Sequence, residues 1–338
     1  TTIQAAIDAS DANDVILIES GEHASFTLQD NVNYSRVGLT VMGLDSLNRP
    51  TITGYDSTRS IEVLGTDLTL KHLSLRNGYA GTNTQWNSQR GGLLYGTGTN
   101  VSIVSCDFKD GYAPQGGDYY AGGGGLTFIN CEFLKNEKQK NTMIHVDNGM
   151  WAEFYNSLFN AKGYTNRIFS NGYTHRIYNS TFVNLEGRLY VQPWTGHEFV
   201  FVNNILTVKA GSNYQIEPDT TTNLWNGWDG MVTIKNSRLP VIPASYMYNT
   251  TGGISVTSSD TLPVHFVDSA NGDFRLSLLD DHHNIGDTTI TLYKDANEVN
   301  RPDVNGYVDY GAYESDASFC EIKNARASIL QTIRDNAG

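Results

Sequence analysis

The sequence contains little cysteine, little charge and no long apolar run. Three cysteines among 338 residues are too few, and odd in number, for a disulfide framework. No run of about 18 apolar residues occurs, so we expect no membrane-spanning helix. Charged residues make up only 17% of the chain, and the formal net charge of −13 argues against nucleic acids and anionic membrane surfaces as partners.

What the chain does contain is an internal repeat. The phrase VSIVSCDFKDG at 101–111 returns as LTFINCEFLKN at 126–136, AEFYNSLFNAKG at 152–163, HRIYNSTFVNLEG at 175–187 and EFVFVNNILTVKAG at 198–211. A degenerate copy, LTLKHLSLRNG, occupies 68–78. The polar residue that ends each apolar run recurs in steps of 25, 26, 23 and 24 residues, at Ser105, Asn130, Asn156, Asn179 and Asn203. A fixed period of this length indicates a solenoid, in which each repeat stacks on its neighbours.

The repeat has the periodicity of β-strands. Large apolar side chains fall at every second position, as at Leu126 and Phe128. The Gly, Asn and Thr residues between the copies argue against an α-solenoid. A period of about 24 residues suits three short strands per turn, each paired in parallel with the same strand one turn up. We therefore predict a parallel β-helix.

Stacking of parallel strands assigns structural roles to several residues. Strands lie roughly 4.8 Å apart, so equivalent residues on successive turns form columns. One inward column contains Leu73, Cys106, Cys131, Ser157, Ser180 and Asn204, and a second contains Phe108, Phe133, Phe159 and Phe182. We expect Cys106 and Cys131 to be stacked free thiols, although they are close enough in principle to bridge. The asparagine column is expected to run its amides up the inside of a turn.

One stretch, GGLLYGTGTNVSIVSCDFKDGYA at 91–113, resembles a turn of the right-handed parallel β-helix in the pectate-lyase-like superfamily, in bacterial surface and secreted β-helix proteins and in phage tailspikes. TTIQAAIDASDANDVILIESGEH at the start is similar to the N-terminal cap of that family, a short amphipathic helix that leads into the first strand. FVDSANGDFRLS, NIGD and RPDVNGYVDYGAYE are similar to its C-terminal closing element. The resemblance implies an all-β fold, a single-stranded right-handed parallel β-helix, and leaves the chemistry open.

On this basis residues 1–314 form the β-helix, with a cap at 1–10, irregular excursions at 218–265 and the closing element at 266–314. The C-terminal tail, 315–338, is predicted to be helical, with an apolar stripe formed by Ile322, Ala325, Ile329, Leu330 and Ile333. We expect this helix to dock on the β-helix, and the alternative is an oligomer contact, for example in a homotrimer.

A further strand in each turn carries candidate binding residues. If Ile144 and Val146 point inward, His145 and Asp147 point outward. The predicted carbohydrate-binding strip on this face consists of Tyr119 or Tyr120, His145, Asp147, Tyr190, Gln192, Trp194 and Gln215. Aromatic faces stack on sugar rings and charged groups orient hydroxyls and carboxylates. The alternative is that these are ordinary strand residues on a solvated face.

Catalysis would need more than this strip. A uronan lyase must neutralise a sugar carboxylate and abstract the adjacent proton. His145 as base, with Arg167 and Arg188 as neutralisers, forms a weak candidate site on successive turns. A hydrolase would need two carboxylates roughly 5–10 Å apart, and in the central strip only Asp147, with Glu186 more remote, is available.

Metal-binding signals are weak. DANEVNRPDVNG at 295–306 has oxygen ligands that suit Ca²⁺, but it lacks the spacing of an EF-hand loop, and turn chemistry explains it better. A metal site at the adjacent histidines His282 and His283 is improbable. We assign no metal ligands and keep Ca²⁺ as a cofactor only for the lyase hypothesis.

We expect an extracellular, cell-surface or virion protein whose partner is a polysaccharide or surface glycan. The leading hypothesis is a glycan-binding or structural component, such as an adhesin, tailspike or fibre part. The alternative is a polysaccharide lyase that acts on an acidic, uronate-containing polymer. The sequence lacks a clear catalytic signature, which favours the first.

Overall fold

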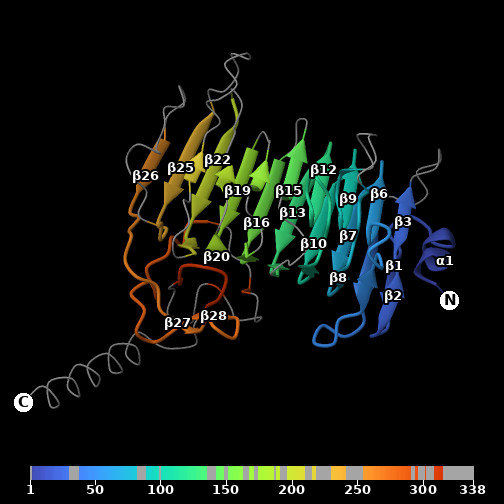
Figure 1. The fold of residues 1–338 in the computed structure, drawn as a ribbon, viewed down its shortest axis with the longest axis horizontal. Coiled ribbons are helices and arrows are strands. Elements are labelled where there is room, and N and C mark those ends of the chain that lie inside the picture. The colour runs from blue at the N-terminus through green and yellow to red at the C-terminus, as the bar shows by residue number, and fades with distance from the viewer. Residues whose placement is uncertain are drawn as a thin grey trace, which may run out of the picture.

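The computed structural model describes residues 2–29, 38–81, 89–98, 100–134, 142–147, 151–162, 167–170, 174–185, 188–190, 196–209, 215–217, 230–240, 254–290, 294–295, 301 and 308–314. Three parallel sheets run along the molecule and wind into one coil (Figure 1). The prediction of a single-stranded right-handed parallel β-helix is confirmed. The only helix among the described residues, α1 (Ile3–Asp8), is too short to cross a membrane.

In the part of the chain that the structure describes, each of the first eight turns contributes one strand to each sheet, and two further strands extend the first sheet. Sheet A has ten strands: β1 (Val15–Ile18), β4 (Leu39–Gly43), β7 (Leu68–Lys71), β10 (Val101–Val104), β13 (Gly125–Ile129), β16 (Trp151–Tyr155), β19 (Thr174–Tyr178), β22 (Glu198–Val202), β25 (Met231–Lys235) and β26 (Ile254–Thr257). Sheet B has eight: β2 (Glu22–Ala24), β5 (Thr51–Thr53), β8 (Ser74–Arg76), β11 (Asp107–Lys109), β14 (Glu132–Phe133), β17 (Leu158–Asn160), β20 (Thr181–Leu185) and β23 (Ile205–Val208). Sheet C has eight: β3 (Phe26–Gln29), β6 (Ile61–Leu64), β9 (Leu94–Thr97), β12 (Tyr119–Gly122), β15 (Thr142–Asp147), β18 (Arg167–Ser170), β21 (Arg188–Tyr190) and β24 (Gln215–Glu217).

Strands β25 and β26 correct one expectation. Residues 218–265 were predicted to leave the repeat as irregular excursions, but two segments within this range extend sheet A. Val232 and Ile234 keep the inward alternation there, and both are buried. The signal is present in the sequence, because VTIKNS at 232–237 and ISVTSS at 254–259 are further copies of the repeat phrase. The inward column continues through them, since the Asn204 N–H donates to the Ser237 hydroxyl (3.1 Å) and the Ser237 N–H donates to the Ser259 hydroxyl (3.2 Å).

The cap forms as predicted. The Thr2 hydroxyl accepts a hydrogen bond from the Ala5 N–H (3.1 Å) and caps α1, while Ile7 is fully buried. The side chain of Gln4 accepts from the Thr27 N–H (2.9 Å) and donates to the Thr27 carbonyl (3.1 Å). The helix thereby satisfies backbone groups of β3, the end strand of sheet C, and protects that exposed edge.

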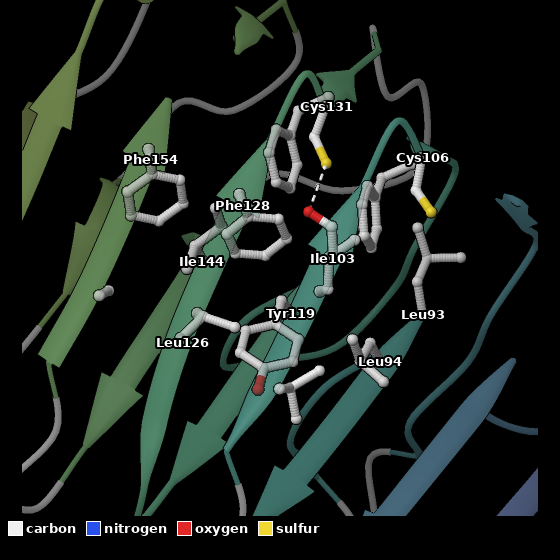
Figure 2. Close-up of a cluster of buried hydrophobic side chains, with 14 of the residues drawn as sticks. Leu93, Leu94, Ile103, Cys106, Tyr119, Leu126, Phe128, Cys131, Ile144 and Phe154 are labelled. Atoms are coloured by element: carbon white, nitrogen blue, oxygen red, sulfur yellow. Dashed lines mark hydrogen bonds between the residues drawn. The ribbon is translucent and has the colours of Figure 1, made fainter. Parts of the chain in front are cut away.

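The core consists of stacked like residues. The rings of Phe108, Phe133, Phe159 and Phe182 stack in sequence, with centroid separations of 4.8, 4.8 and 4.3 Å, which confirms the predicted column. A second stack pairs Phe128 with Phe154 at 5.0 Å (Figure 2). Each ring therefore buries its face against an equivalent ring one turn away.

The cysteine column is also confirmed. Cys106 and Cys131 are buried free thiols, and burial raises the pKa of Cys106 to about 12, so it stays protonated. Along the column, the backbone N–H of each residue donates to the side chain one turn up: Leu73 to Cys106 (3.4 Å), Cys131 to Ser157 (3.3 Å), Ser157 to Ser180 (3.1 Å) and Ser180 to Asn204 (2.7 Å). The polar atoms of this buried column thus have partners supplied by the repeat itself.

The asparagine column lies at the corner between sheets A and B. Ser105, Asn130, Asn156, Asn179 and Asn203 adopt left-handed φ values of 51°, 56°, 49°, 47° and 59°. The side-chain amide of Asn156 donates a hydrogen bond to that of Asn130 (3.2 Å), and the amide of Asn203 donates to that of Asn179 (2.9 Å). The expectation that the amides line the inside of the turn is wrong. Because the following residue points into the core, the asparagines face the C-terminal segment, where Asn203 exchanges hydrogen bonds with the Asp287 backbone (2.9 and 2.6 Å).

That C-terminal segment packs against the side of the coil. Its hairpin, β27 (Phe266–Asp268) with β28 (Asp273–Leu276), lies near sheet B (Figure 1). Phe274 contacts Leu158 and Val183, and Leu276 clusters with Ile205. The described part of the closing element therefore docks on the outer face of sheet B, where that face becomes apolar. The predicted helical tail, 315–338, lies outside the described residues.

Candidate functional site

The outer face of sheet C carries a column of aromatic side chains. Glu62, Tyr95, Tyr120 and His145 occupy the same register position on β6, β9, β12 and β15. The rings of Tyr95 and Tyr120 stack at 5.5 Å, and those of Tyr120 and His145 at 5.2 Å. His145 thus projects from the outer face, as predicted.

The prediction that this column is exposed is wrong. Tyr120 is 1% exposed and His145 is 6% exposed. Tyr119 points the other way, into the core, where its ring meets Phe128 edge-to-face at 5.8 Å (Figure 2). Its phenol is buried, which raises its pKa above the usual value. None of these three side chains is therefore an open platform for sugars.

Two arginines explain part of this burial. The guanidinium of Arg59 lies 4.3 Å from the ring centroid of Tyr95, and that of Arg90 lies 4.6 Å from the centroid of Tyr120. Arg59 also donates to Glu62 (3.0 Å) and to the backbone carbonyl of Arg90 (2.9 Å). A layer of cations therefore covers the tyrosine column.

At the N-terminal end of this layer a cavity of about 400 Å³ opens beside α1. We call it the cap pocket. Its walls come from α1, from β3 and β6, from the turn before β6 and from the segment after β8, and its lining includes Gln4, Ser25, Thr27, Ser57, Thr58, Arg59, Glu62 and Tyr79. Arg59 and Glu62 keep 19% and 28% of their side-chain surfaces exposed. Unlike the tyrosine column, these groups are accessible to a ligand.

The aromatic wall of the pocket is held in place by stacking. The ring of Tyr79 lies parallel to that of Tyr112, with centroids 5.1 Å apart and an interplanar angle of 8°. The hydroxyls of Ser25 and Thr58, which also line the pocket, are 3.2 Å apart. A fixed aromatic ring, an ion pair and hydroxyl groups therefore converge on one cavity.

The proposed lyase residues do not form one column. Their strands β15, β18 and β21 are successive, as expected. In the register, however, Arg167 pairs with Thr142 and Arg188, while His145 pairs with Ser170. His145 therefore lies three residues along the strand from the level of the two arginines.

The remaining predicted strip is only partly described. Gln215 lies in β24 and pairs with Arg188. The side chains of Asp147, Tyr190 and Gln215 lie outside what the structure describes, as do all of Gln192 and Trp194. Their assignment to carbohydrate binding remains a prediction.

Sequence reasoning missed Arg59, Tyr79 and Arg90. A signal for Tyr79 was present, because NGYA at 77–80 and DGYA at 110–113 are two copies of one phrase and predict the stacked pair Tyr79 and Tyr112. No comparable repeat marks the arginines. Among the described residues, no group of three or more His, Cys, Asp or Glu side chains is arranged to hold a metal ion.

No protein-family model matches the chain, and no curated protein matches it. Solved structures do. The pectate lyase Pel9A superimposes with a TM-score of 0.52 over 92% of this chain and 90% of its own, at 15% identity. The chain has the pectate-lyase-like parallel β-helix fold. A pectin methylesterase from Yersinia enterocolitica (TM-score 0.43, 14% identity, 77% of this chain and 90% of that one) and pectin methylesterase PemA from Erwinia chrysanthemi (0.38, 16%, 71% and 75%) are also similar. At these identities the likeness describes the fold alone.

Proposed function

We propose that this protein acts outside the cell or on a virion and binds a polysaccharide or surface glycan, as an adhesin, tailspike or fibre component does. The observation that carries the proposal is the cap pocket, where the Tyr79 ring, the Arg59–Glu62 ion pair and the hydroxyls of Ser25 and Thr58 converge. The strip predicted on the later turns of sheet C would extend this site.

The chemistry of the pocket suits a sugar. Tyrosine offers an apolar face for the C–H side of a sugar ring, and its orientation is already fixed by Tyr112, so little conformational entropy is lost on binding. The carboxylate and guanidinium of the ion pair can accept from and donate to adjacent hydroxyls. The volume of about 400 Å³ falls within the usual range for small-ligand sites, roughly 300–1,000 Å³.

Arg59 is the group in this pocket that can bind an acidic sugar. Its guanidinium lines the cavity next to Glu62, with which it forms an ion pair (3.0 Å). A planar guanidinium binds a carboxylate through two parallel hydrogen bonds. A uronate-containing polymer is therefore the first ligand to test.

The rival function is a polysaccharide lyase. Arg59 would neutralise the uronate, and the Tyr79 phenol is the lining group that would abstract the proton. The similar structure of pectate lyase Pel9A makes this rival worth testing. The two functions differ in one readout, because only a lyase produces an unsaturated sugar end.

The first experiment measures binding by affinity gel electrophoresis through a panel of acidic polysaccharides. We expect retardation of the native protein by at least one polymer and about tenfold weaker binding of Tyr79→Ala, since the variant loses the stacking ring. Tyr55→Ala is the matched control, because Tyr55 lies one turn before Tyr79, is 57% exposed and is outside the set of lining residues. Equal retardation of both variants, or none of the native protein, would remove the cap pocket as the site.

The second experiment decides between binding and cleavage. The native protein is incubated with the same polymers, with and without Ca²⁺, while the ultraviolet absorbance of an unsaturated sugar end is followed. Binding without a rise in absorbance supports the adhesin or tailspike role. A rise that disappears in Arg59→Ala assigns lyase activity to the pocket, and a rise that disappears only in His145→Ala, Arg167→Ala or Arg188→Ala assigns it to the central turns.

A further inference from the structure

A second exposed aromatic group lies on a different sheet. Trp151, the first residue of β16, is 41% exposed on the outer face of sheet A. Its neighbours along the strand, Ala152 and Phe154, point into the core, so the alternation of the strand directs Trp151 outward. Solvent-exposed tryptophan is uncommon because burial of the indole is favourable.

The ring of Trp151 lies over a glycine of the adjacent strand. Trp151 pairs in register with Gly125 of β13, and a side chain at Gly125 would place its first carbon 2.1 Å from Cζ2 and 2.3 Å from Cε2 of the indole. The absence of a side chain at Gly125 therefore leaves the space that the indole occupies. The tryptophan is a fixed surface group that lies over the sheet.

A row of charged groups lies beside Trp151 on the same face. Glu153 and Arg176 lie two residues further along their strands than the level of Trp151, and Glu198 lies at the level of Trp151 itself. Arg176 on β19 donates to Glu153 on β16 (2.9 Å) and, from Nε and Nη2, to Glu198 on β22 (3.0 and 2.7 Å). The side chains of Arg176, Glu153 and Glu198 keep 36%, 22% and 43% of their surfaces exposed. The row is bonded internally and still faces solvent.

An aromatic pair follows at the ends of these strands. Tyr155 and Tyr178 pair in register, and their ring centroids are 5.2 Å apart. The Tyr155 hydroxyl donates to Glu153 (3.1 Å), which connects this pair to the charged row. From Trp151 to Tyr155 the strand spans about 13 Å, at roughly 3.3 Å per residue.

We propose that this face, the sheet A patch formed by Trp151, Glu153, Arg176 and Glu198, is a second carbohydrate-binding surface and that it takes a neutral polysaccharide. The indole is the stacking platform for a sugar ring, and the charged row binds hydroxyls. Two carboxylates face one guanidinium here, so an acidic polymer is repelled. The cap pocket, by contrast, is lined by one guanidinium and one carboxylate, and the two surfaces lie on different sheets.

The test uses the full chain in affinity gels that contain a soluble neutral polymer, namely hydroxyethyl cellulose, dextran or mannan in separate gels. We expect retardation by at least one polymer and a loss of about three- to tenfold in affinity for Trp151→Ala. Leu47→Ala, at a 96% exposed residue remote in sequence from the patch, is the control and should bind like the native protein. Tyr79→Ala should also retain this binding, which separates the patch from the cap pocket.

Gly125→Ala is a second variant that keeps the tryptophan and fills the space that its indole occupies. The methyl group displaces only the far end of the indole, so the fold should persist while the platform moves, and we expect weaker retardation. Native-like retardation of both Trp151→Ala and Gly125→Ala would overturn the proposal. So would a native protein that no neutral polymer retards, or a dimer in solution that Trp151→Ala converts to a monomer, because the patch would then be covered by a second copy.

Discussion

The coil and the C-terminal segment, residues 260–314, are stabilised in different ways. In the coil, each residue of a column repeats the contact made one turn below, as when Ser157 and Ser180 each place a hydroxyl on the backbone N–H of the preceding turn. These groups are neutral and equivalent. The loss of one of them leaves its neighbours paired, so stability is spread over many turns.

The C-terminal segment depends on a few buried charges. The imidazole of His282 lies between Asp280 (2.5 Å) and Asp260 (3.0 Å) and is fully buried. His283 lies between Asp309 (2.9 Å) and the Ser277 carbonyl (2.8 Å). A carbonyl can only accept a hydrogen bond and an ionised carboxylate is also an acceptor, so these two partners favour a His283 ring that donates from both nitrogens, the imidazolium, and its pKa is raised accordingly.

Substitutions should therefore destabilise the C-terminal segment more than the coil. In a column of neutral groups, a substitution by a side chain of similar shape changes the stability little. A buried charge that loses its partner incurs the full cost of desolvation. The C-terminal segment should therefore open as a unit of its own while the coil remains folded.

The largest effect is expected for His282→Ala. Asp280 has no exposed side-chain surface, so its carboxylate would stay buried after losing its hydrogen bond to the His282 imidazole. We expect the free energy of local opening around residues 277–286 to fall by about 3–5 kcal/mol. Amide hydrogen exchange measures this opening residue by residue, and the Ser157 and Ser180 amides of the coil should remain unchanged.

His265→Ala serves as the control, because this histidine is exposed and its hydrogen bonds to Asp280 and Ser277 use its backbone N–H and carbonyl, which the substitution keeps. It should leave exchange in the segment as it is in the native protein. If His282→Ala accelerates exchange in the coil to the same extent, the segment and the coil unfold together and the comparison fails.

A smaller effect on the stability of the C-terminal segment is expected when the pH is changed. Burial by itself lowers the pKa of His282, but its hydrogen bonds to Asp280 and Asp260 outweigh burial and raise the pKa above the usual value of about 6.5. The pKa of His283 is likewise raised by Asp309 against the effect of burial. A raised histidine pKa stabilises the folded state fully below about pH 6.5 and less as the pH rises through the folded-state value.

The carboxyl of Asp280 determines how the stability of the C-terminal segment changes at acidic pH. Burial opposes ionisation of this carboxyl, but hydrogen bonds from His282 and from the His265 and His282 N–H groups lower its pKa. Its contribution is therefore lost only as the pH falls through that lowered value. We expect proteolysis within the segment to be slowest near pH 6 and faster at pH 9, with the pH dependence above pH 6 abolished in the double variant His282→Gln/His283→Gln. A native protein equally resistant at both values would contradict the assignment of charged histidines.

The same contrast explains what could be predicted from the sequence. The Phe108 to Phe182 column and the two stacked thiols follow from a repeat that copies residue types at a fixed spacing. The corner asparagines were found for the same reason, but their direction was not, since the segment that they contact lies 84 residues away in the case of Asn203 and Asp287. Local periodicity contains no information about such a partner.

The candidate site was predictable only in part for a related reason. Alternation places His145 outward, but the adjacent tyrosines Tyr119 and Tyr120 fit either register, and a shift of one residue exchanges the two faces. Whether an outward residue is exposed depends on side chains from other turns, here Arg59 and Arg90, whose positions no repeat specifies. A signal for the docked segment does exist on sheet B, where the outward column changes from Asp107 and Glu132 to apolar residues.

The smallest effect is expected for Cys131→Ser, within the coil. The Sγ atom donates to the Ile129 carbonyl (3.4 Å), and Ser157, one turn up, makes the equivalent bond to Tyr155 (3.0 Å). A serine at 131 should adopt the same geometry, so we expect a loss of about 1 kcal/mol or less in the free energy of unfolding, measured by urea denaturation. Cys131→Ala, which removes both the bond and the volume, should cost more. An alanine variant more stable than the serine variant would contradict this prediction. Position 131 would then require an apolar side chain, and Cys131 and Ser157 would not be equivalent members of the column.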